Sequence, residues 1–176
     1  MSGTRVPERL RWGVEQLPPV LDTPVLEIGC GAGHAVDLLL TRYPGTSVTA
    51  IDRSPTQIAR ARARLATKLT SDPLRLEPLE LYTAPRVLGL NRFGVVLAIN
   101  VNAFWTDPVE AFGAAADLLA PGGQVYLVYE APNARQRQRL QATVPELASD
   151  RSFRVADVRT ARGAGFHGIC VVAERR

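Results

Sequence analysis

The sequence contains few of the residues that indicate a disulfide scaffold, a zinc site or a membrane span. Among its 176 residues there are two cysteines, Cys30 and Cys170, and they lack the paired spacing of zinc ligands. No apolar run approaches the roughly 18 residues that a membrane helix requires, and the N-terminus lacks the apolar block of a signal peptide. We therefore expect a reduced, cytoplasmic protein that has no structural metal and does not associate with a membrane.

Lysine is also nearly absent, because Lys68 is the only lysine among 21 basic residues. The formal net charge is +4, yet the arginines are distributed over the whole chain and are interspersed with acidic residues. Proteins that bind nucleic acid usually concentrate basic side chains on one face. The dispersed charge therefore indicates a solvated surface and argues against a nucleic-acid partner.

What the sequence does contain is an alternation of strand-like and helix-like segments. Apolar or β-branched runs predict strands at 25–28, 47–52, 73–81, 93–100 and 124–130, and a terminal pair at 153–160 and 168–174. Apolar residues at helical spacing predict helices at about 6–17, 34–42, 55–67, 108–120 and 133–148. The loop at 162–167 is too short for a crossover helix, so the last two strands should be antiparallel.

These elements predict a single α/β domain covering residues 1–176. Parallel neighbours in a sheet need a crossover connection, and this is usually a right-handed helix. The expected fold is therefore a doubly wound, Rossmann-like, seven-stranded mixed sheet. It would have five parallel strands, a C-terminal antiparallel hairpin and helices on both faces.

Two helix starts carry the residues of a capping box. Ser54 is expected to cap the helix at 55–67, with Pro55 in its first position and the Gln57 side chain reaching back. The segment from Asp107 to Glu110 repeats this pattern before an alanine-rich helix. Both segments are therefore expected to begin helices with side-chain caps.

A glycine-rich turn follows the first predicted strand. Gly29, Gly31 and Gly33 permit positive backbone angles and leave the main chain open to a ligand that side chains would obstruct. Asp52 ends the second strand, where an acid in an open α/β sheet can hydrogen-bond ribose hydroxyls. Together these residues predict a nucleoside site at the carboxyl ends of the strands.

Two details separate this turn from a nicotinamide site. Its spacing is G-x-G-x-G, and His34 stands where the third glycine of G-x-G-x-x-G would be. Glu27 precedes the turn, and a pyrophosphate has no use for a carboxylate there, whereas the cationic methionine end of S-adenosylmethionine (SAM) does. The residues therefore favour a positively charged nucleoside.

Four ordered segments resemble the class I SAM-dependent methyltransferases. They are VLEIGCGAGH (25–34), AIDRSPTQI (50–58), FGVVLAINVNAFW (93–105) and LLAPGGQVYLVYEAP (118–132). Together they cover most of residues 20–132, whereas the chain beyond Pro132 resembles the family only in its strand pattern. The resemblance implies SAM as the cofactor.

The resemblance also implies roles for individual residues. Glu27 and the three turn glycines would surround the amino acid moiety, Asp52 would hold the ribose, and Arg53 and Glu80 would lie beside the adenine. Asn100 and Val101 would lie beside the methionine and the methyl group. With Cys30 and Gln57 from the same segments, the expected cofactor contacts are Glu27, Gly29, Cys30, Gly31, Gly33, Asp52, Arg53, Gln57, Glu80, Asn100 and Val101.

Methyl transfer from a sulfonium is an in-line displacement, so alignment and exclusion of water can supply most of the rate without a general base. The acceptor pocket is expected to draw on Asn102, Phe104, Trp105, Tyr129, Glu130, Phe166 and His167. We predict catalytic roles for Asn102, Trp105 and His167, with His167 as the candidate general base. The competing interpretations are packing for the two aromatic residues 104 and 105, a turn for Asn102, and an exposed loop for His167.

The predicted function is methyl transfer to an O or N atom of a small-molecule acceptor. A short N-terminal segment leaves the site open, which suits a bulky or carrier-attached acceptor, or completion of the site by a second copy in a homodimer. No bound metal is expected, because Asn100 and Glu130 stand where catechol-type enzymes carry acidic ligands. The alternatives are an RNA or protein methyltransferase of the same fold, and a non-catalytic SAM-binding accessory or regulatory protein.

Overall fold

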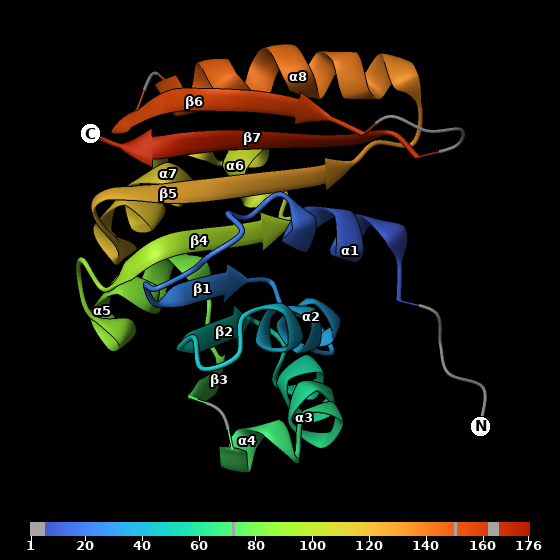
Figure 1. The fold of residues 1–176 in the computed structure, drawn as a ribbon. Coiled ribbons are helices and arrows are strands. Elements are labelled where there is room, and N and C mark those ends of the chain that lie inside the picture. The colour runs from blue at the N-terminus through green and yellow to red at the C-terminus, as the bar shows by residue number, and fades with distance from the viewer. Residues whose placement is uncertain (1–5, 72, 150, 162–165) are drawn as a thin grey trace.

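The protein forms one twisted seven-stranded sheet with the strand order β3-β2-β1-β4-β5-β7-β6 (Figure 1). The computed structural model describes residues 6–71, 73–149, 151–161 and 166–176. The strands are β1 (Val25–Ile28), β2 (Val48–Asp52), β3 (Leu74–Pro78), β4 (Phe93–Ile99), β5 (Leu119–Glu130), β6 (Phe153–Thr160) and β7 (Gly168–Arg175). The predicted fold class is confirmed.

The first five strands are parallel to one another, and β7 is antiparallel to both of its neighbours, β5 and β6. The last strand of the chain therefore lies inside the sheet, and β6 forms its edge. Residues 162–165 of the predicted hairpin loop lie outside the described residues. The antiparallel terminal pair is confirmed.

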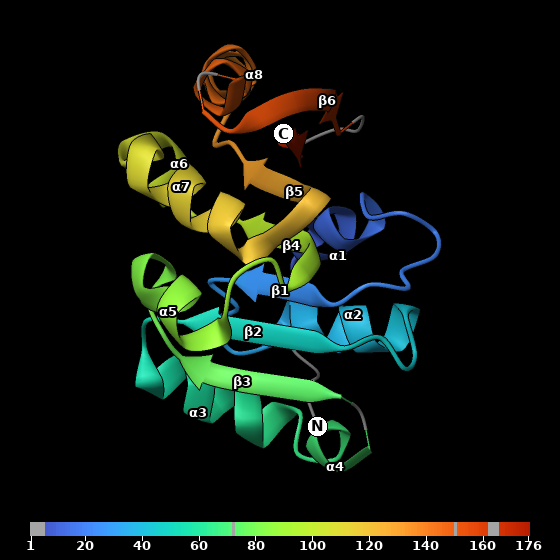
Figure 2. The same cartoon turned by 90° about the vertical axis from the view of Figure 1, so that its left-hand side faces the viewer.

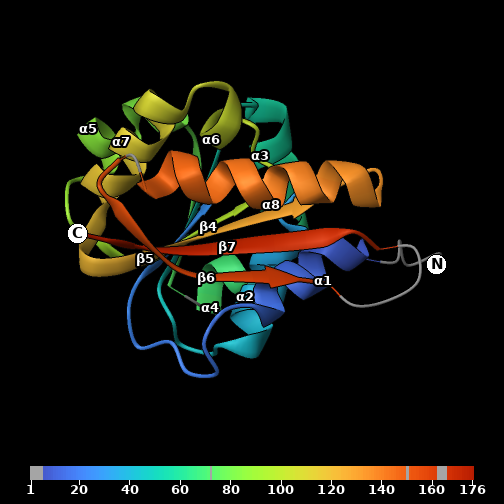
Figure 3. The same cartoon turned by 90° about the horizontal axis from the view of Figure 1, so that it is seen from above.

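Helices cover both faces of the sheet, as Figure 2 shows. One core lies under the 3-10 helix η1 (Leu81–Thr83) and the helices α5 (Ala84–Leu88), α6 (Ala103–Thr106), α7 (Pro108–Leu118) and α8 (Ala134–Ser149). The opposite core lies under α1 (Glu8–Glu15), α2 (His34–Arg42) and α3 (Pro55–Arg64), with the short α4 (Lys68–Ser71) beside them. In Figure 3, α8 runs lengthwise along β7 and β6.

Several element boundaries differ from the prediction. Strand β5 begins at Leu119 and not at Gln124, because its first residues pair with β4 through an irregular register after Phe93. Helix α3 ends at Arg64, short of the predicted residue 67. The short elements η1, α5 and α6 were not predicted, since a single turn carries too little hydrophobic periodicity to be recognised.

Only part of the predicted helix capping is present in the structure. The Gln57 amide donates to Ser54 Oγ at 3.3 Å, so Ser54 caps α3 as expected. The Ser54 amide, however, donates to Asp52 Oδ1 at 2.9 Å, which leaves no place for the Gln57 side chain. At the second site Asp107 is the N-cap of α7 but makes no side-chain capping bond. Burial and the nearby Asp107 carboxylate raise the pKa of Tyr82.

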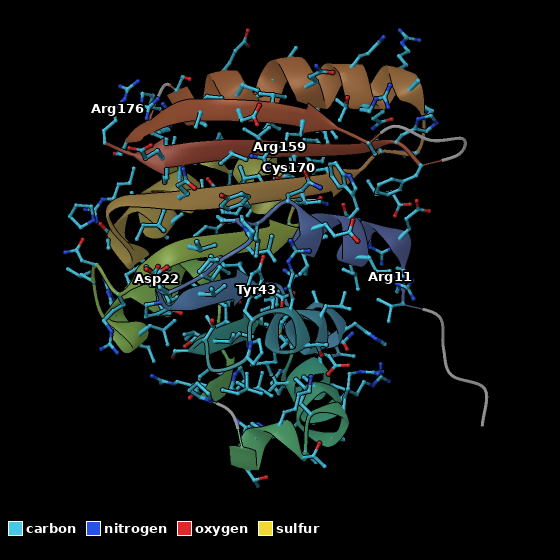
Figure 4. All side chains as sticks on the ribbon, in the orientation of Figure 1. Arg11, Asp22, Tyr43, Arg159, Cys170 and Arg176 are labelled. Carbon is cyan, nitrogen blue, oxygen red and sulfur yellow. The ribbon has the colours of Figure 1, made fainter. Side chains whose placement is uncertain are left out.

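The segment before β1 is held by contacts with distant parts of the chain. The Tyr43 hydroxyl donates to the Pro18 carbonyl at 2.7 Å, and Arg159 Nη1 donates to the Gln16 carbonyl at 2.7 Å (Figure 4 labels both side chains). Trp12 of α1 packs edge-on against Phe166, with 5.6 Å between the ring centroids. The N-terminal helix is thereby fixed against the terminal hairpin.

No helix within the described ranges is long and apolar enough to cross a membrane.

Candidate functional site: a cavity at the carboxyl ends of the strands

A cavity of about 440 Å³ opens where β1, β2, β3 and β4 end. The carboxyl ends of parallel strands meet at one edge of the sheet, and ligands of open α/β folds bind there. The turn after β1 forms one wall and the loop after β4 forms the facing wall. The lining residues are Ile28, Gly29, Ile51, Asp52, Arg53, Leu79, Glu80, Leu81, Tyr82, Asn100, Val101, Asn102, Ala103 and Thr106.

The glycine turn after β1 brings bare backbone close to neighbouring elements. Gly29 has φ +72°, and a Cβ there would lie 2.9 Å from Val101 Cγ2, so only glycine lets the two walls approach this closely. Gly33 has φ +77°, and its Cβ would lie 3.0 Å from the Cβ of Ala61 in α3. Gly29 therefore shapes the cavity, while Gly33 allows the turn to pack against α3.

The Asp52 carboxylate organises the turn and also faces the cavity. Its Oδ2 accepts the Gly31 amide at 2.9 Å, and its Oδ1 accepts the Ser54 amide at 2.9 Å. Each carboxylate oxygen can accept a second hydrogen bond. Asp52 can therefore hold the glycine turn in place and still accept from two hydroxyl groups of a ligand.

Glu27 is buried at the base of the turn, with 2 % of its surface exposed. Its Oε2 atom has no hydrogen-bond partner among the described residues. Burial, with a smaller contribution from the charge of Asp52, raises the pKa of Glu27 to about 8. A buried carboxyl group without a partner is costly when ionised, so this position is complementary to a cationic ligand.

Most of the expected cofactor residues are brought together at the cavity. Gly29, Asp52, Arg53, Glu80, Asn100 and Val101 all line it. Glu27 and Gly31 lie at the base and the bend of the same turn and connect to Asp52 through charge and a hydrogen bond, respectively. Glu27 and Gly31 therefore lie next to Asp52, which is part of the cavity wall.

Five of the expected cofactor residues are not part of the cavity lining: Glu27, Cys30, Gly31, Gly33 and Gln57. The Cys30 side chain turns into the core beneath α1 and α2, where burial raises the pKa of its thiol. The Cβ direction of Gly33 is filled by α3. Gln57 Oε1 is buried, with no hydrogen-bond partner among the described residues. The cavity lining therefore supports direct cofactor contact for none of these five residues, although Glu27 and Gly31 adjoin Asp52, which does line the cavity.

The residues predicted for the acceptor are divided by the structure. Asn102 lines the cavity, and its Oδ1 accepts from Trp105 Nε1 at 3.3 Å, which places the half-exposed indole at the rim. Phe104 is fully buried against Phe112, with ring centroids 5.2 Å apart, so the packing interpretation holds for it. Asn102 and Trp105 are thus the predicted catalytic residues that the structure brings near the cavity.

The remaining candidates lie towards the terminal hairpin. Phe166 is buried against Trp12, and the His167 carbonyl accepts the Ala131 amide at 2.9 Å. Glu130 forms an ion pair with Arg9 at 3.2 Å. His167 and Glu130 sit at the carboxyl end of β5 but outside the cavity lining. The role of His167 as a base stays a prediction.

Sequence reasoning missed Tyr82, Leu79, Ala103 and Thr106 in the cavity wall. Tyr82 lies in η1, which packs against α7, so it connects segments that follow β3 and β4. These residues belong to short segments that were read as strand or loop. Their one available signal was position, because each follows the carboxyl end of β3 or β4.

Comparison with known proteins identifies the family. A family described as "Methyltransferase domain" matches residues 26–125. Trans-aconitate 2-methyltransferase of Rhizobium meliloti is 38% identical over 110 residues, which are 61% of this chain and 38% of that protein. The ubiquinone biosynthesis O-methyltransferase of Thiobacillus denitrificans is 32% identical over 120 residues, which are 68% of this chain and 49% of that protein. The chain thus spans half or less of these curated relatives.

Solved structures share the fold at low sequence identity. Geranyl diphosphate C-methyltransferase from Streptomyces coelicolor superposes with a TM-score of 0.74 at 13% identity, covering 96% of this chain and 80% of the other. A sarcosine dimethylglycine methyltransferase from Galdieria sulphuraria gives 0.73 at 11% identity, covering 94% and 84%. The chain belongs to the class I SAM-dependent methyltransferase family, as the resemblance of its sequence predicts.

Proposed function

We propose that this chain binds SAM in the cavity described above and transfers its methyl group to an O or N atom of a small-molecule acceptor. The observation that carries the proposal is the buried, unpartnered Oε2 of Glu27 beside a turn that a side chain at Gly29 would block. A cationic ligand satisfies the orphaned oxygen, and a nucleoside fits against bare backbone. The donor set of the cavity therefore fits SAM.

Each residue would contact the part of the cofactor that its side chain complements chemically. Glu27 would balance the positive charge of the amino acid end, and Asp52 would accept hydrogen bonds from the ribose hydroxyls. Arg53, Glu80 and Tyr82 would enclose the adenine, because they follow β2 and β3 at the other end of the cavity. Bound SAM supplies an activated methyl group, so the protein's contribution is to align the acceptor and to exclude water.

The acceptor would approach over the rim formed by Asn102 and Trp105. The relatives carry names of enzymes that act on small molecules, namely trans-aconitate and an intermediate of ubiquinone biosynthesis, which supports the same broad class here. The exposed rim suits an acceptor that is bulky or attached to a carrier, and a second copy of the chain in a homodimer would serve the same purpose of covering the site. A carboxylate, phenol or amine acceptor agrees with this proposal.

The test is direct binding followed by turnover. Titration calorimetry of the wild-type protein with SAM and with its demethylated product, S-adenosylhomocysteine, should give one site per chain. Methyl transfer should then be measured with panels of carboxylic acids, phenols and amines, alongside bulk RNA and a protein mixture. Absence of binding to both cofactor forms would refute the proposal. Turnover confined to RNA or protein would refute its acceptor class.

A further inference from the structure

The loop that follows β4 is bound to the end of β5 by three hydrogen bonds. The Asn100 amide donates to the Val128 carbonyl at 2.8 Å, and the Glu130 amide donates to Asn100 Oδ1 at 2.8 Å. The Tyr129 hydroxyl donates to the Val101 carbonyl at 3.0 Å. We call residues 100–102 the β4 loop. These bonds involve both the backbone and the side chains of two adjacent strand ends.

Asn100 adopts a backbone conformation that L residues rarely take. Its φ is +56°, and asparagine tolerates this left-handed region better than most residues because its short polar side chain can hydrogen-bond locally. Here the side chain bonds to the neighbouring strand and thereby fixes the turn. Backbone strain of this kind persists where the surrounding structure enforces it, and it is often found at functional sites.

Tyr129 supplies the second connection from a buried position. Its side chain is 4 % exposed, and burial raises the pKa of its hydroxyl, which stays protonated and acts as a donor. A buried hydroxyl without a partner is costly, so the bond to the Val101 carbonyl satisfies two groups at once. Tyr129 was expected to contact the acceptor. The structure instead places it beneath the β4 loop.

The position of the β4 loop sets the width of the cavity. Val101 Cγ2 lies 2.9 Å from the point where a Cβ on Gly29 would be, so the loop and the glycine turn face each other at close range. A loop released from β5 would move relative to the glycine turn. The cavity wall that Asn100, Val101 and Asn102 provide would move with it.

We propose that Tyr129 is a positioning residue, which holds the β4 loop through the Val101 carbonyl and so fixes the cofactor cavity at its working width. Asn100 acts in the same way through the Glu130 amide. This inference rests on the proposed function, because it concerns the same cavity. It differs from that function in assigning a role to a side chain that touches neither cofactor nor acceptor.

Tyr126 provides a matched control on the same strand. It is 2 % exposed, and its hydroxyl donates to Gln124 Oε1 at 2.8 Å, but it faces the core beneath α1 and α2 and makes no bond to the β4 loop. Tyr129→Phe and Tyr126→Phe therefore each remove one buried, hydrogen-bonded hydroxyl. A loss of thermal stability caused by removing a buried hydroxyl should appear in both variants. Weaker cofactor binding, caused by a change in the cavity, should appear only in Tyr129→Phe.

The experiment measures the dissociation constant of S-adenosylhomocysteine by calorimetry, together with thermal unfolding of each variant. We expect Tyr129→Phe to weaken binding about tenfold, as loss of a bond to a buried carbonyl implies, and Tyr126→Phe to stay within about twofold of wild type. Asn100→Gly keeps the left-handed backbone and removes the side-chain bond. It should weaken binding in the same direction, but Asn100 also lines the cavity, so Tyr129→Leu, which removes the same hydroxyl, is the second variant if Tyr129→Phe fails to fold.

Each outcome decides the inference. Equal affinity in wild type and Tyr129→Phe would overturn it while leaving the proposed function intact, whatever the result for Asn100→Gly. Equal weakening by Tyr129→Phe and Tyr126→Phe would overturn it as well, since the effect would then be general. A wild-type protein that binds neither cofactor form would overturn the proposed function, and this inference with it. Weaker binding in Tyr129→Phe that Tyr126→Phe does not share would establish it.

Discussion

Two regions of the molecule contribute to the site in different ways. The cavity region, residues 25–106, supplies every described residue that lines the 440 Å³ cavity. The C-terminal region, residues 134–175, comprises α8, β6 and β7 and adds none of its described residues to that lining. The cavity is thus formed by turns that follow the parallel strands, whereas the C-terminal region completes the sheet.

Strand β5 joins the two regions. Its end holds the β4 loop through Tyr129 and the Glu130 amide, and the Glu130 side chain reaches Arg9 of α1. The family match ends at residue 125, close to this junction. The division in the structure thus lies close to the end of the family match, and the following variants test whether function divides in the same place.

The largest expected effect is the pH dependence of the free energy of unfolding that is caused by Glu27 in the cavity region. The ordinary pKa of a glutamate is 4.5, and burial raises that of Glu27 to about 8, so the folded state binds the proton more tightly. This contribution to stability is present below pH 4.5 and is lost as the pH rises to about 8. The loss is on the order of 5 kcal/mol. Urea unfolding across this range should show the decline in wild type and not in Glu27→Gln.

Glu146→Gln is the control for this prediction, because Glu146 is an exposed carboxylate of α8 in the C-terminal region. Its pH profile should follow that of the wild type. If Glu27→Gln and wild type declined in parallel, the assignment of the raised pKa to Glu27 would be wrong.

The next effect concerns Asp52. Asp52→Ala removes the two bonds that hold the Gly31 and Ser54 amides, as well as the proposed ribose contact. We expect the affinity for S-adenosylhomocysteine to fall about 100-fold, since hydrogen bonds to charged groups contribute about 1.5–3 kcal/mol. The matched change in the C-terminal region is Asp157→Ala, which removes an exposed ion pair with Arg159. Calorimetry should find its affinity unchanged, and equal losses in both variants would contradict the division.

Gly29→Ala tests the close approach of the two cavity walls. Gly122, at the start of β5, has φ +73°, almost the same as the +72° of Gly29, and a Cβ there would meet no described atom within 4 Å. Both alanine variants bear the same backbone penalty, but the new methyl group at position 29 also collides with Val101. We expect Gly29→Ala to unfold about 1 kcal/mol more easily than Gly122→Ala and to bind the cofactor more weakly. Equal free energies of unfolding and equal affinities in the two variants would show that the walls can separate without a loss of free energy.

The smallest effect is expected for the ion pair between α1 and β5. Arg9 and Glu130 are both partly exposed, and such pairs contribute about 0–1 kcal/mol. Arg9→Gln should change the free energy of unfolding by about 0.5 kcal/mol or less, with little change in cofactor affinity. A large loss of affinity would mean that α1 takes part in the cavity, and the proposed division would then have to include it.

The cavity region was more predictable from the sequence because its signals are local. Glycines in a turn, an acid before it and an acid at the end of the next strand act through backbone conformations within a few residues of each other. Gly29, Asp52, Arg53, Asn100 and Val101 were all expected, and all line the cavity.

Other features depend on contacts between distant segments. The insertion of β7 between β5 and β6, the burial of Cys30 and the bond of Tyr129 to the β4 loop join residues far apart in the chain. The sequence contains no local pattern that specifies such contacts. Tyr82 escaped prediction for a related reason, since it belongs to a single helical turn whose place depends on α7.

The most direct test of the account is calorimetric titration of the wild-type protein with S-adenosylhomocysteine near pH 7 in buffers of different ionisation enthalpy. Glu27, with its pKa raised to about 8, is mostly protonated before binding and should ionise against the ligand's ammonium group. We predict binding at one site with release of a substantial fraction of a proton, and no such release by Glu27→Gln. Absence of binding, or binding with the same proton balance in both proteins, would contradict the assignment of this cavity to a cationic nucleoside.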